Sequence, residues 1–268
     1  MKPLVSDALW EKVAPLLPPE PKPGKKGGRK VTVSNRQAFT GILFVLRTAL
    51  AWQMLPLEMN CGSGSTCWRR FNAWTKRGVW KRLHKLLLRE LSWAGEIDWS
   101  RAALDSSTVA AKKRGNYIGP NPTDKGRAGC KRPLVVDATG IPLAVRLSAA
   151  NVNDCQRVAQ MLDAIPALPH RGPGRPRRRP GKMHADKGYD FKKCRHACRV
   201  RGITPRIARR GIESSERLGR YRWVVERDFA WLNALRRLRT RYDRFARHYI
   251  GFLDLGRALI CWNYLSKL

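Results

Sequence analysis

Residues 102–105 read Ala-Ala-Leu-Asp, and residues 183–186 read Met-His-Ala-Asp. Each stretch is a short apolar run of the kind that forms a buried strand, and each ends in an aspartate. A third acid, Glu226, lies in the stretch Trp-Val-Val-Glu-Arg, where the spacing of apolar residues predicts a helix. Two strand ends and one helix would bring Asp105, Asp186 and Glu226 together, and carboxylate oxygens are the ligands that Mg²⁺ prefers.

The region around these acids alternates between short β runs and helices. We expect five strands, at residues 102–110, 131–136, 141–147, 183–186 and 203–207. Helices are expected at residues 154–162, 190–199 and 221–268, the last with one break at 242–245. The order β-β-β-α-β-α-β-α resembles that of the ribonuclease H-like fold, in which metal-binding acids lie on the first and fourth strands and on a late helix. We therefore predict an α/β protein whose residues 96–268 form a ribonuclease H-like catalytic core, with a mixed five-stranded sheet and C-terminal helices.

Residues 1–95 are predicted to be helical instead. Four helices are expected, at residues 7–17, 36–51, 67–77 and 79–91, with a basic Pro/Gly/Lys linker at 19–30. The third helix follows a glycine turn, and its apolar stripe is expected to contain Trp68, Phe71 and Trp74. This arrangement resembles a helix-turn-helix reader of DNA, and a helical bundle with a solvated basic face is the alternative. We therefore predict an all-α, helix-turn-helix-like DNA-binding region ahead of the catalytic region.

The charge of the chain indicates the kind of partner it binds. Its 268 residues include 54 Lys and Arg against 20 Asp and Glu, which gives a net charge of +34. Such a charge attracts polyanions, and nucleic acid is favoured over a membrane because no apolar stretch is long enough to span a bilayer. With 43% hydrophobic residues and ten Trp, the chain can bury a core, which argues against a purely chromatin-compacting protein.

The cysteines predict neither a disulfide framework nor a metal site. Seven Cys without paired spacing, and an N-terminus without a visible signal peptide, are typical of a cytoplasmic protein. The stretch Cys194-Arg-His196-Ala-Cys198 could place two sulfurs on one helical face. Structural zinc sites usually need two ligand pairs, however, and no second pair is near. We therefore expect reduced thiols.

Position separates the three acids from the other carboxylates of the region. Asp137 lies in a predicted hairpin turn and others occupy predicted helix caps, where acids serve the local backbone. Glu226 follows Arg222 by four residues, so an ordinary surface ion pair on one helix is the alternative to a metal site. Two Mg²⁺ ions held by the trio could assist an in-line phosphoryl displacement. Lys187 and Arg222, which are close in sequence to the acids, could hold DNA phosphates.

Six stretches of the chain carry recognisable motifs. Three of them read Ala-Leu-Asp-Ser-Ser-Thr-Val at 103–109, Ala-Asp-Lys-Gly-Tyr-Asp at 185–190 and Arg-Trp-Val-Val-Glu-Arg-Asp-Phe-Ala-Trp-Leu at 222–232. The others lie at 44–56, 119–126 and 130–143. Together they resemble bacterial insertion-sequence transposases of the insertion-sequence-five family over nearly the whole chain. The resemblance implies a DDE transposase whose acidic triad falls on Asp105, Asp186 and Glu226.

This resemblance also implies a reaction and a set of partners. The N-terminal helices would bind the terminal inverted repeats of the insertion sequence, with a homodimer assembled on double-stranded DNA. Two Mg²⁺ ions, which Mn²⁺ can replace, would support hydrolysis that frees a 3′-OH and then its transfer into target DNA. We expect this to occur at the nucleoid of a bacterial cytoplasm. Two alternatives remain: a transposase-derived DNA-binding protein without catalysis, and a ribonuclease H-like nuclease without strand transfer.

The chain departs from the family pattern near the third acid. Related elements have a Tyr three residues before the Arg and a basic residue seven after the Glu. Here those positions hold Gly219 and Asn233, with Tyr221 nearby. The departure affects the part of the signature that handles DNA hairpins, and it leaves the triad intact. Ten cations are predicted to contact DNA: Arg69, Arg70, Lys76, Arg77, Lys112, Lys113, Lys187, Arg222, Arg236 and Arg237.

Overall fold

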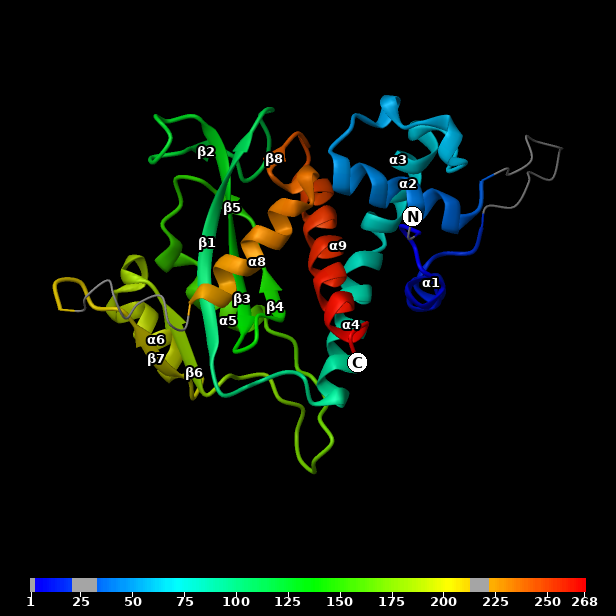
Figure 1. Ribbon diagram of the computed structural model, residues 1–268. Helices are drawn as coiled ribbons and strands as arrows, with labels where there is room; N and C mark the ends of the chain where they lie inside the picture. The colour runs from blue at the N-terminus through cyan, green and yellow to red at the C-terminus, as the bar shows by residue number, and fades with distance from the viewer. Residues whose placement is uncertain (1–2, 21–32, 213–221) are drawn as a thin grey trace.

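The computed structural model describes residues 3–20, 33–212 and 222–268. Most of the predicted basic linker, together with Gly219 and Tyr221, lies outside these ranges. Figure 1 shows a sheet flanked by helices, with the N-terminal helices gathered on the side of α9. Among the residues described, no helix is both long and apolar enough to cross a bilayer.

A mixed sheet built around β1 (Ala102–Ala111) forms the centre of the fold. β1 pairs antiparallel with β3 (Ala128–Asp137) and parallel with β6 (Lys182–Ala185). β7 (Thr204–Ile207) extends the sheet in parallel beyond β6, and β4 (Pro142–Val145) lies antiparallel on the other side of β3. All five predicted strands are therefore present, and the prediction of a mixed sheet is confirmed.

Three further strands have only two residues each. They are β2 (Gly119–Pro120), β5 (Ser148–Ala149) and β8 (Thr240–Arg241). β2 and β5 pair with β3, and β8 pairs in parallel with the end of β1. Two residues are too few to show an alternation of apolar and polar positions, so the sequence pattern did not predict these strands.

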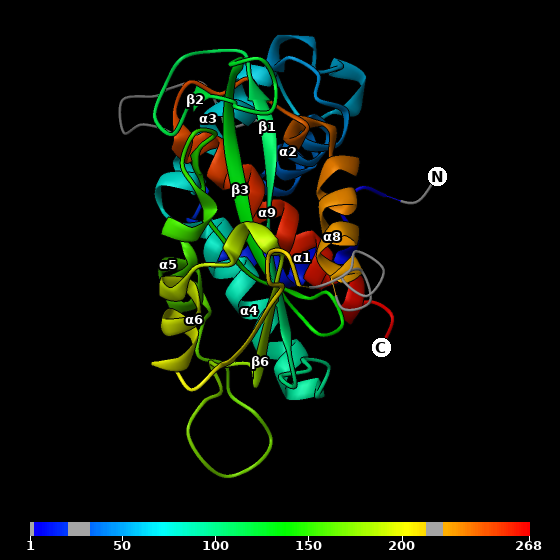
Figure 2. The same ribbon diagram turned by 90° about the vertical axis from the view of Figure 1, so that its left-hand side faces the viewer.

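Helices lie on both sides of the sheet (Figure 2). Those on one side are α5 (Val158–Ala164) and α6 (Lys192–Arg199), and those on the other are α8 (Trp223–Ala234) and α9 (Ala246–Leu265). Within the described ranges, three short 3-10 turns connect these elements: η4 (Asp154–Gln156), η5 (Lys187–Tyr189) and η7 (Arg236–Leu238). The predicted C-terminal break is present but begins earlier, because η7 and β8 lie between α8 and α9.

Helices of the N-terminal region pack against the C-terminal helix. They are α1 (Asp7–Val13), α2 (Asn35–Thr48), α3 (Gly64–Lys76) and α4 (Val79–Ala94), with the turns η1 (Ala14–Leu16), η2 (Trp52–Met54) and η3 (Leu57–Met59) between them. α4 lies along α9, and one hydrophobic core continues from these helices into the sheet. The functional division at residue 95 stays a prediction.

The apolar stripe of α3 differs from the predicted one. Cys67, Phe71 and Trp74 are buried, at spacings of four and three residues, whereas Trp68 is 39% exposed. A helix turns about 100° per residue, so Trp68 lies beside the stripe and not on it. Residues 49–63, which contain η2 and η3, connect α2 to α3. This connection is longer than the tight turn expected of a helix-turn-helix unit.

Candidate active site

Asp105 and Asp186 come from neighbouring parallel strands. Ala103 on β1 is in register with His184 on β6. Asp105 lies two residues further along β1, and Asp186 lies two residues after His184, just past the end of β6. The two carboxylates therefore stand level at the same end of the strand pair. Burial raises the pKa of Asp105, and the nearby charge of Asp186 raises it further, whereas hydrogen bonding to Ser106 and the charge of Arg222 oppose the shift.

The guanidinium of Arg222 forms an ion pair with Asp105. Arg222 precedes the first turn of α8, and its Nη2 donates to Asp105 Oδ2 at 3.0 Å. The other oxygen of Asp105 accepts from the Ser106 backbone N–H at 2.7 Å. Asp186 Oδ1 accepts from the Gly188 backbone N–H at 2.9 Å. Arg222, one of the cations predicted to hold a DNA phosphate, thus lies beside the acids and forms an ion pair with Asp105.

Glu226 lies one helical turn beyond Arg222, in the first turn of α8, with an exposed side chain. Among the described residues, no three His, Cys, Asp or Glu side chains approach closely enough to hold a metal ion. Asp105 and Asp186 nevertheless fit a divalent cation in donor type and in charge. Glu226 does not approach these two acids closely enough to complete such a site, so the three-acid metal site stays a prediction.

Arg227 anchors the helix that carries Glu226. Its guanidinium lies 4.6 Å from the ring centres of both Trp223 and Trp231, which are four residues before and after it. It also donates to Tyr264 Oη on α9 at 2.9 Å and to the carbonyl of Thr139 in the turn after β3. These contacts join α8 to α9 and to the sheet, and thereby fix the side of α8 next to Glu226.

Asp228 is an unusual acid that was not among the predicted site residues. Its side chain is fully buried on α8, and neither carboxylate oxygen has a hydrogen-bond partner in the described part of the chain. Burial raises the pKa of Asp228 to about 8. One signal was available in the sequence, because Asp228 is four residues from both Val224 and Leu232, which are buried on the same side of the helix.

The ten cations predicted to contact DNA occupy different environments. Those with exposed side chains are Arg69, Lys76, Arg77, Lys112, Lys113 and Arg236. Arg70 is half-buried and donates to the side chain of Asn35 and to the carbonyl of Val33, and Lys187 is half-buried beside Asp186. Arg237 is buried and forms a 3.2 Å ion pair with Asp243, a position that does not suit the phosphate contact predicted for it.

Asn233 occupies the position where related elements have a basic residue. Its Oδ1 accepts from Nη2 of Arg132, a buried guanidinium on β3, at 3.0 Å. Arg132 also donates to Ser107 Oγ at 3.1 Å and to the Leu238 carbonyl at 3.2 Å. Asn233 therefore joins α8 to the central strands, and the oxygen of its amide is used in a hydrogen bond within the fold.

All seven cysteines are free and buried, as the sequence predicted for reduced thiols. Burial raises the pKa of both Cys194 and Cys198 on α6 to about 11, which keeps them protonated near neutral pH.

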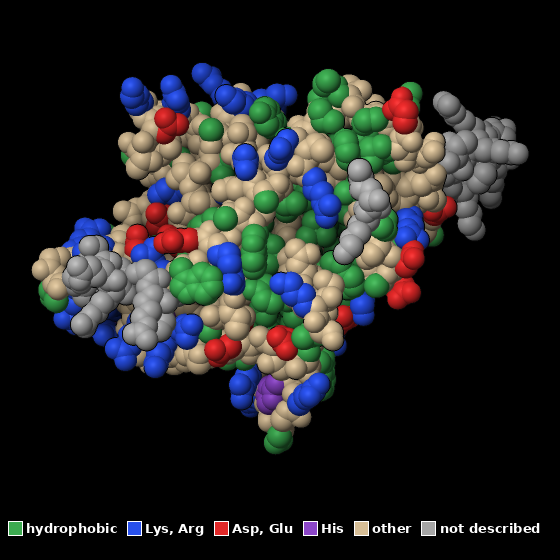
Figure 3. Space-filling model, viewed as in Figure 1, with side chains coloured by type: hydrophobic (Ala, Val, Ile, Leu, Met, Phe, Trp, Pro, Cys, Tyr) green, Lys and Arg blue, Asp and Glu red, His purple; other side chains and the backbone are tan. Residues whose placement is uncertain are grey.

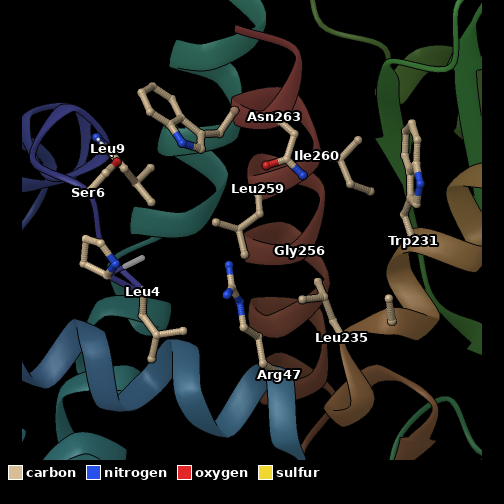
Figure 4. Close-up of a pocket in the computed structure, with 13 residues that line it drawn as sticks. Leu4, Ser6, Leu9, Arg47, Trp231, Leu235, Gly256, Leu259, Ile260 and Asn263 are labelled. Atoms are coloured by element: carbon tan, nitrogen blue, oxygen red, sulfur yellow. Dashed lines mark hydrogen bonds between the residues drawn. The ribbon is translucent and has the colours of Figure 1, made fainter. Parts of the chain in front are cut away.

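A groove of about 440 Å³ lies away from the acids, between α1, α8 and α9 (Figure 4). Leu4 and Leu9 line one side of it, and Leu235, Leu259 and Ile260 line the other. None of the three predicted catalytic acids lines this groove.

Comparison with known proteins covers both regions of the chain. Residues 5–84 match the family described as "Putative transposase of IS4/5 family", and residues 99–263 match the family described as "Transposase DDE domain". The chain is 52% identical over 150 residues to the "Putative transposase for insertion sequence element IS402" of Burkholderia cepacia, over 56% of this chain and 70% of that protein. It is 55% identical over 122 residues to the "Insertion element IS402 uncharacterized 16.2 kDa protein" of the same organism, over 45% of this chain and 82% of that protein.

Among solved structures, the fold is similar to that of a piggyBac transposase in a synaptic complex with hairpin DNA. The TM-score is 0.54 at 9% sequence identity, over 96% of this chain and 72% of that chain. At this identity the similarity concerns the fold alone. The match to residues 99–263 and the identity to the IS402 protein show that this chain belongs to the IS4/5 family of DDE-domain transposases, with the ribonuclease H-like fold that the order of its elements predicted.

Proposed function

We propose that this chain cuts DNA at the terminal repeats of its insertion sequence and joins the freed 3′-OH to target DNA. The observation that supports this proposal most strongly is the level position of Asp105, on β1, and Asp186, directly after the neighbouring parallel strand β6. Two carboxylates so close together repel each other unless a cation lies between them. A divalent metal ion satisfies that requirement, and the same ion is what phosphodiester chemistry needs.

In this proposal, Asp105 and Asp186 hold Mg²⁺ or Mn²⁺, and Glu226 completes the set of ligands from α8. When bound, two such ions activate the attacking oxygen and stabilise the leaving oxygen of a phosphodiester. Arg222 supplies the positive charge beside Asp105 in the structure. A guanidinium binds phosphate as well as it binds carboxylate, so Arg222 can exchange Asp105 for a DNA phosphate near the reacting bond.

Double-stranded DNA is the proposed partner, bound by a homodimer that holds two ends together. The net charge of +34 and the exposed cations Arg69, Lys76 and Arg77 on and after α3 support DNA binding by the N-terminal region. The similar piggyBac transposase was solved in a synaptic complex with DNA, which agrees with this partner. Lys112 and Lys113, at the far end of β1, could continue the same contact along the duplex.

A strand-transfer assay tests the proposal directly. The purified chain is incubated with a labelled duplex that carries the element's terminal repeat, and with a plasmid target, with and without Mg²⁺. We expect a joined product that requires Mg²⁺ and is lost in Glu226→Gln. Glu58→Gln, which changes an exposed acid on η3, serves as the matched control and should leave joining unchanged.

Two other outcomes would replace the proposal. Specific binding of the repeat without cleavage, at every metal concentration, would assign the chain to DNA-binding proteins that have lost catalysis. Cleavage without a joined product would assign it to ribonuclease H-like nucleases.

A further inference from the structure

A second cleft lies between the N-terminal helices and the end of the sheet. Its volume is about 480 Å³, which is within the usual range for small-ligand sites. Residues from both regions of the chain line it: Ala49, Ala51, Trp52, Gln53, Trp68, Lys113, Arg237, Tyr242, Asp243, Arg244 and His248. Ala111, the last residue of β1, is six positions after Asp105, which is roughly 20 Å at the rise of a strand, and Lys113 follows two residues later. The cleft is therefore separate from the acids.

Aromatic rings with free surface line this cleft. Trp68 on α3 is 39% exposed and Tyr242 is 42% exposed, although rings of this size are usually buried. Both rings are nonetheless held in place from behind. Trp68 packs edge-on against His248 with ring centres 6.1 Å apart, and the guanidinium of Arg237 lies 5.5 Å from the centre of the Tyr242 ring. Each ring is therefore held by a neighbouring side chain while part of its surface stays exposed.

Buried polar groups make this support rigid. Arg237 and Asp243 form their 3.2 Å ion pair directly under Tyr242, with only 9% of each side chain exposed. His248 is buried, and its Nε2 lies 2.9 Å from Asn72 Oδ1 on α3. These contacts connect the two sides of the cleft, so its shape is part of the folded core.

Cations stand at the mouth of the cleft on two loops that are fastened together. The Lys112 backbone N–H donates to the Arg241 carbonyl at 2.9 Å. A Cβ on Gly115 would lie 2.1 Å from the Arg244 carbonyl oxygen, so the loops touch backbone to backbone. Lys113 and Arg244 both line the cleft and are exposed. In Figure 3, Lys and Arg side chains gather at this upper end of the molecule, over the ends of β1 and β2.

Aromatic faces beside exposed cations are the combination that binds an unpaired nucleotide. Each base offers a flat face for stacking, and the flanking phosphates pair with Lys and Arg. In an intact duplex the neighbouring bases cover those faces, so only an unstacked base can enter such a cleft. We propose that this cleft binds one unstacked base of a DNA strand on Trp68 and Tyr242, with Lys113 and Arg244 on the adjacent phosphates. This proposal depends on the proposed function only in taking DNA as the partner.

Binding without metal tests the cleft separately from catalysis. Two duplexes of the same sequence are compared, one fully paired and one with a single unpaired 2-aminopurine, whose fluorescence falls when it stacks. We expect the unpaired base to be quenched and the second duplex to bind more tightly. Trp68→Ala should weaken binding of that duplex about tenfold and change binding of the paired duplex less than about twofold. Trp93→Ala, at a somewhat more exposed Trp on α4 (49% exposed), is the matched control and should change neither affinity.

Several results would overturn the cleft proposal. They are equal binding of the two duplexes by the unmodified chain, an unquenched 2-aminopurine, or an equal loss of both affinities in Trp68→Ala. If that variant does not fold, Tyr242→Leu should show the same selective loss, and Trp68→Phe, which keeps a ring, should preserve most of the preference. A chain that binds the unpaired base but joins no DNA would refute the proposed function and would still support the proposal for the cleft.

Discussion

Asp228 should make the chain less stable as the pH rises. Its carboxyl is fully buried (0% exposed) on α8 and has no hydrogen-bond partner in the described part of the chain. Burial raises its pKa to about 8, the charge of Arg227 opposes this shift, and Asp137 adds to it. Asp228→Asn keeps the shape of the side chain and removes the ionisable group, so comparison with the unmodified chain isolates the titration.

The direction and size of the effect follow from proton linkage. The folded chain holds the proton of Asp228 more tightly than the unfolded chain, where the pKa has its ordinary value of 3.8. The stabilising contribution is therefore complete below that value and is lost as the pH rises through the folded pKa. Each pH unit in this window costs about 1.4 kcal/mol, so between about pH 5 and pH 8 the unmodified chain should lose roughly 4 kcal/mol relative to Asp228→Asn.

Urea unfolding followed by Trp fluorescence, repeated across this pH range, measures the difference. The Asn amide also lacks partners and can lower stability by a constant amount, so the slope against pH decides the outcome. Glu58→Gln, at an exposed acid, should run parallel to the unmodified chain. Parallel curves for Asp228→Asn as well, or an unmodified chain that gains stability with pH relative to the variant, would refute the reasoning.

Three further predictions concern packing and catalysis. Gly64→Ala should destabilise the chain by about 3 kcal/mol or more, since its Cβ would lie 1.6 Å from the Trp52 carbonyl oxygen. Gly78→Ala, at a positive φ of 67° but with only the Arg82 guanidinium in ordinary contact at 4.0 Å, should cost only about 1 kcal/mol, and thermal melting distinguishes the two variants. Arg132→Met should cost about 3 kcal/mol in urea unfolding, because it removes the donor of three hydrogen bonds inside the core. Asp186→Asn should abolish cleavage in a nicking assay and leave repeat binding unchanged in a gel-shift assay, and a loss of both would contradict the division between binding and catalytic regions.

The elements that the sequence predicted well are those with enough residues to show a pattern. β1, β3 and β6 are apolar runs whose order along the chain matches a known arrangement of strands, and the structure has them in that arrangement. The two-residue strand β8 is fixed instead by its pairing with the end of β1. The apolar stripe of α3 was predicted wrongly because Trp68 is as apolar as Phe71 and Trp74. Only the position of the other helices decides which side of α3 is buried.

The candidate site shows the same limit at the level of single side chains. Asp105 and Asp186 could be placed together because each ends an apolar run on a predicted strand. The partner of Asp105 could not be predicted, since Arg222 is 117 positions away and helical spacing offers it a nearer acid. For Asp228 the helical spacing did contain the information, because it puts this residue on the same side as buried apolar residues. It was not predicted to be buried because acids ordinarily face solvent.

The ion pair that Arg222 forms bears on the main alternative to a metal site, which is an ordinary surface ion pair between Arg222 and Glu226. Helical spacing alone favours an ion pair between Arg222 and Glu226, which would make Glu226 an ordinary surface residue. Among the described residues no such pair is present, and Arg222 instead donates to Asp105 at 3.0 Å. Because Arg222 directly precedes α8, this bond ties the start of the helix to β1, and the carboxylate of Glu226 is exposed one turn further on. Glu226 is therefore not held in the surface ion pair that helical spacing favours, and its role as the third metal ligand stays a prediction, which Glu226→Gln tests.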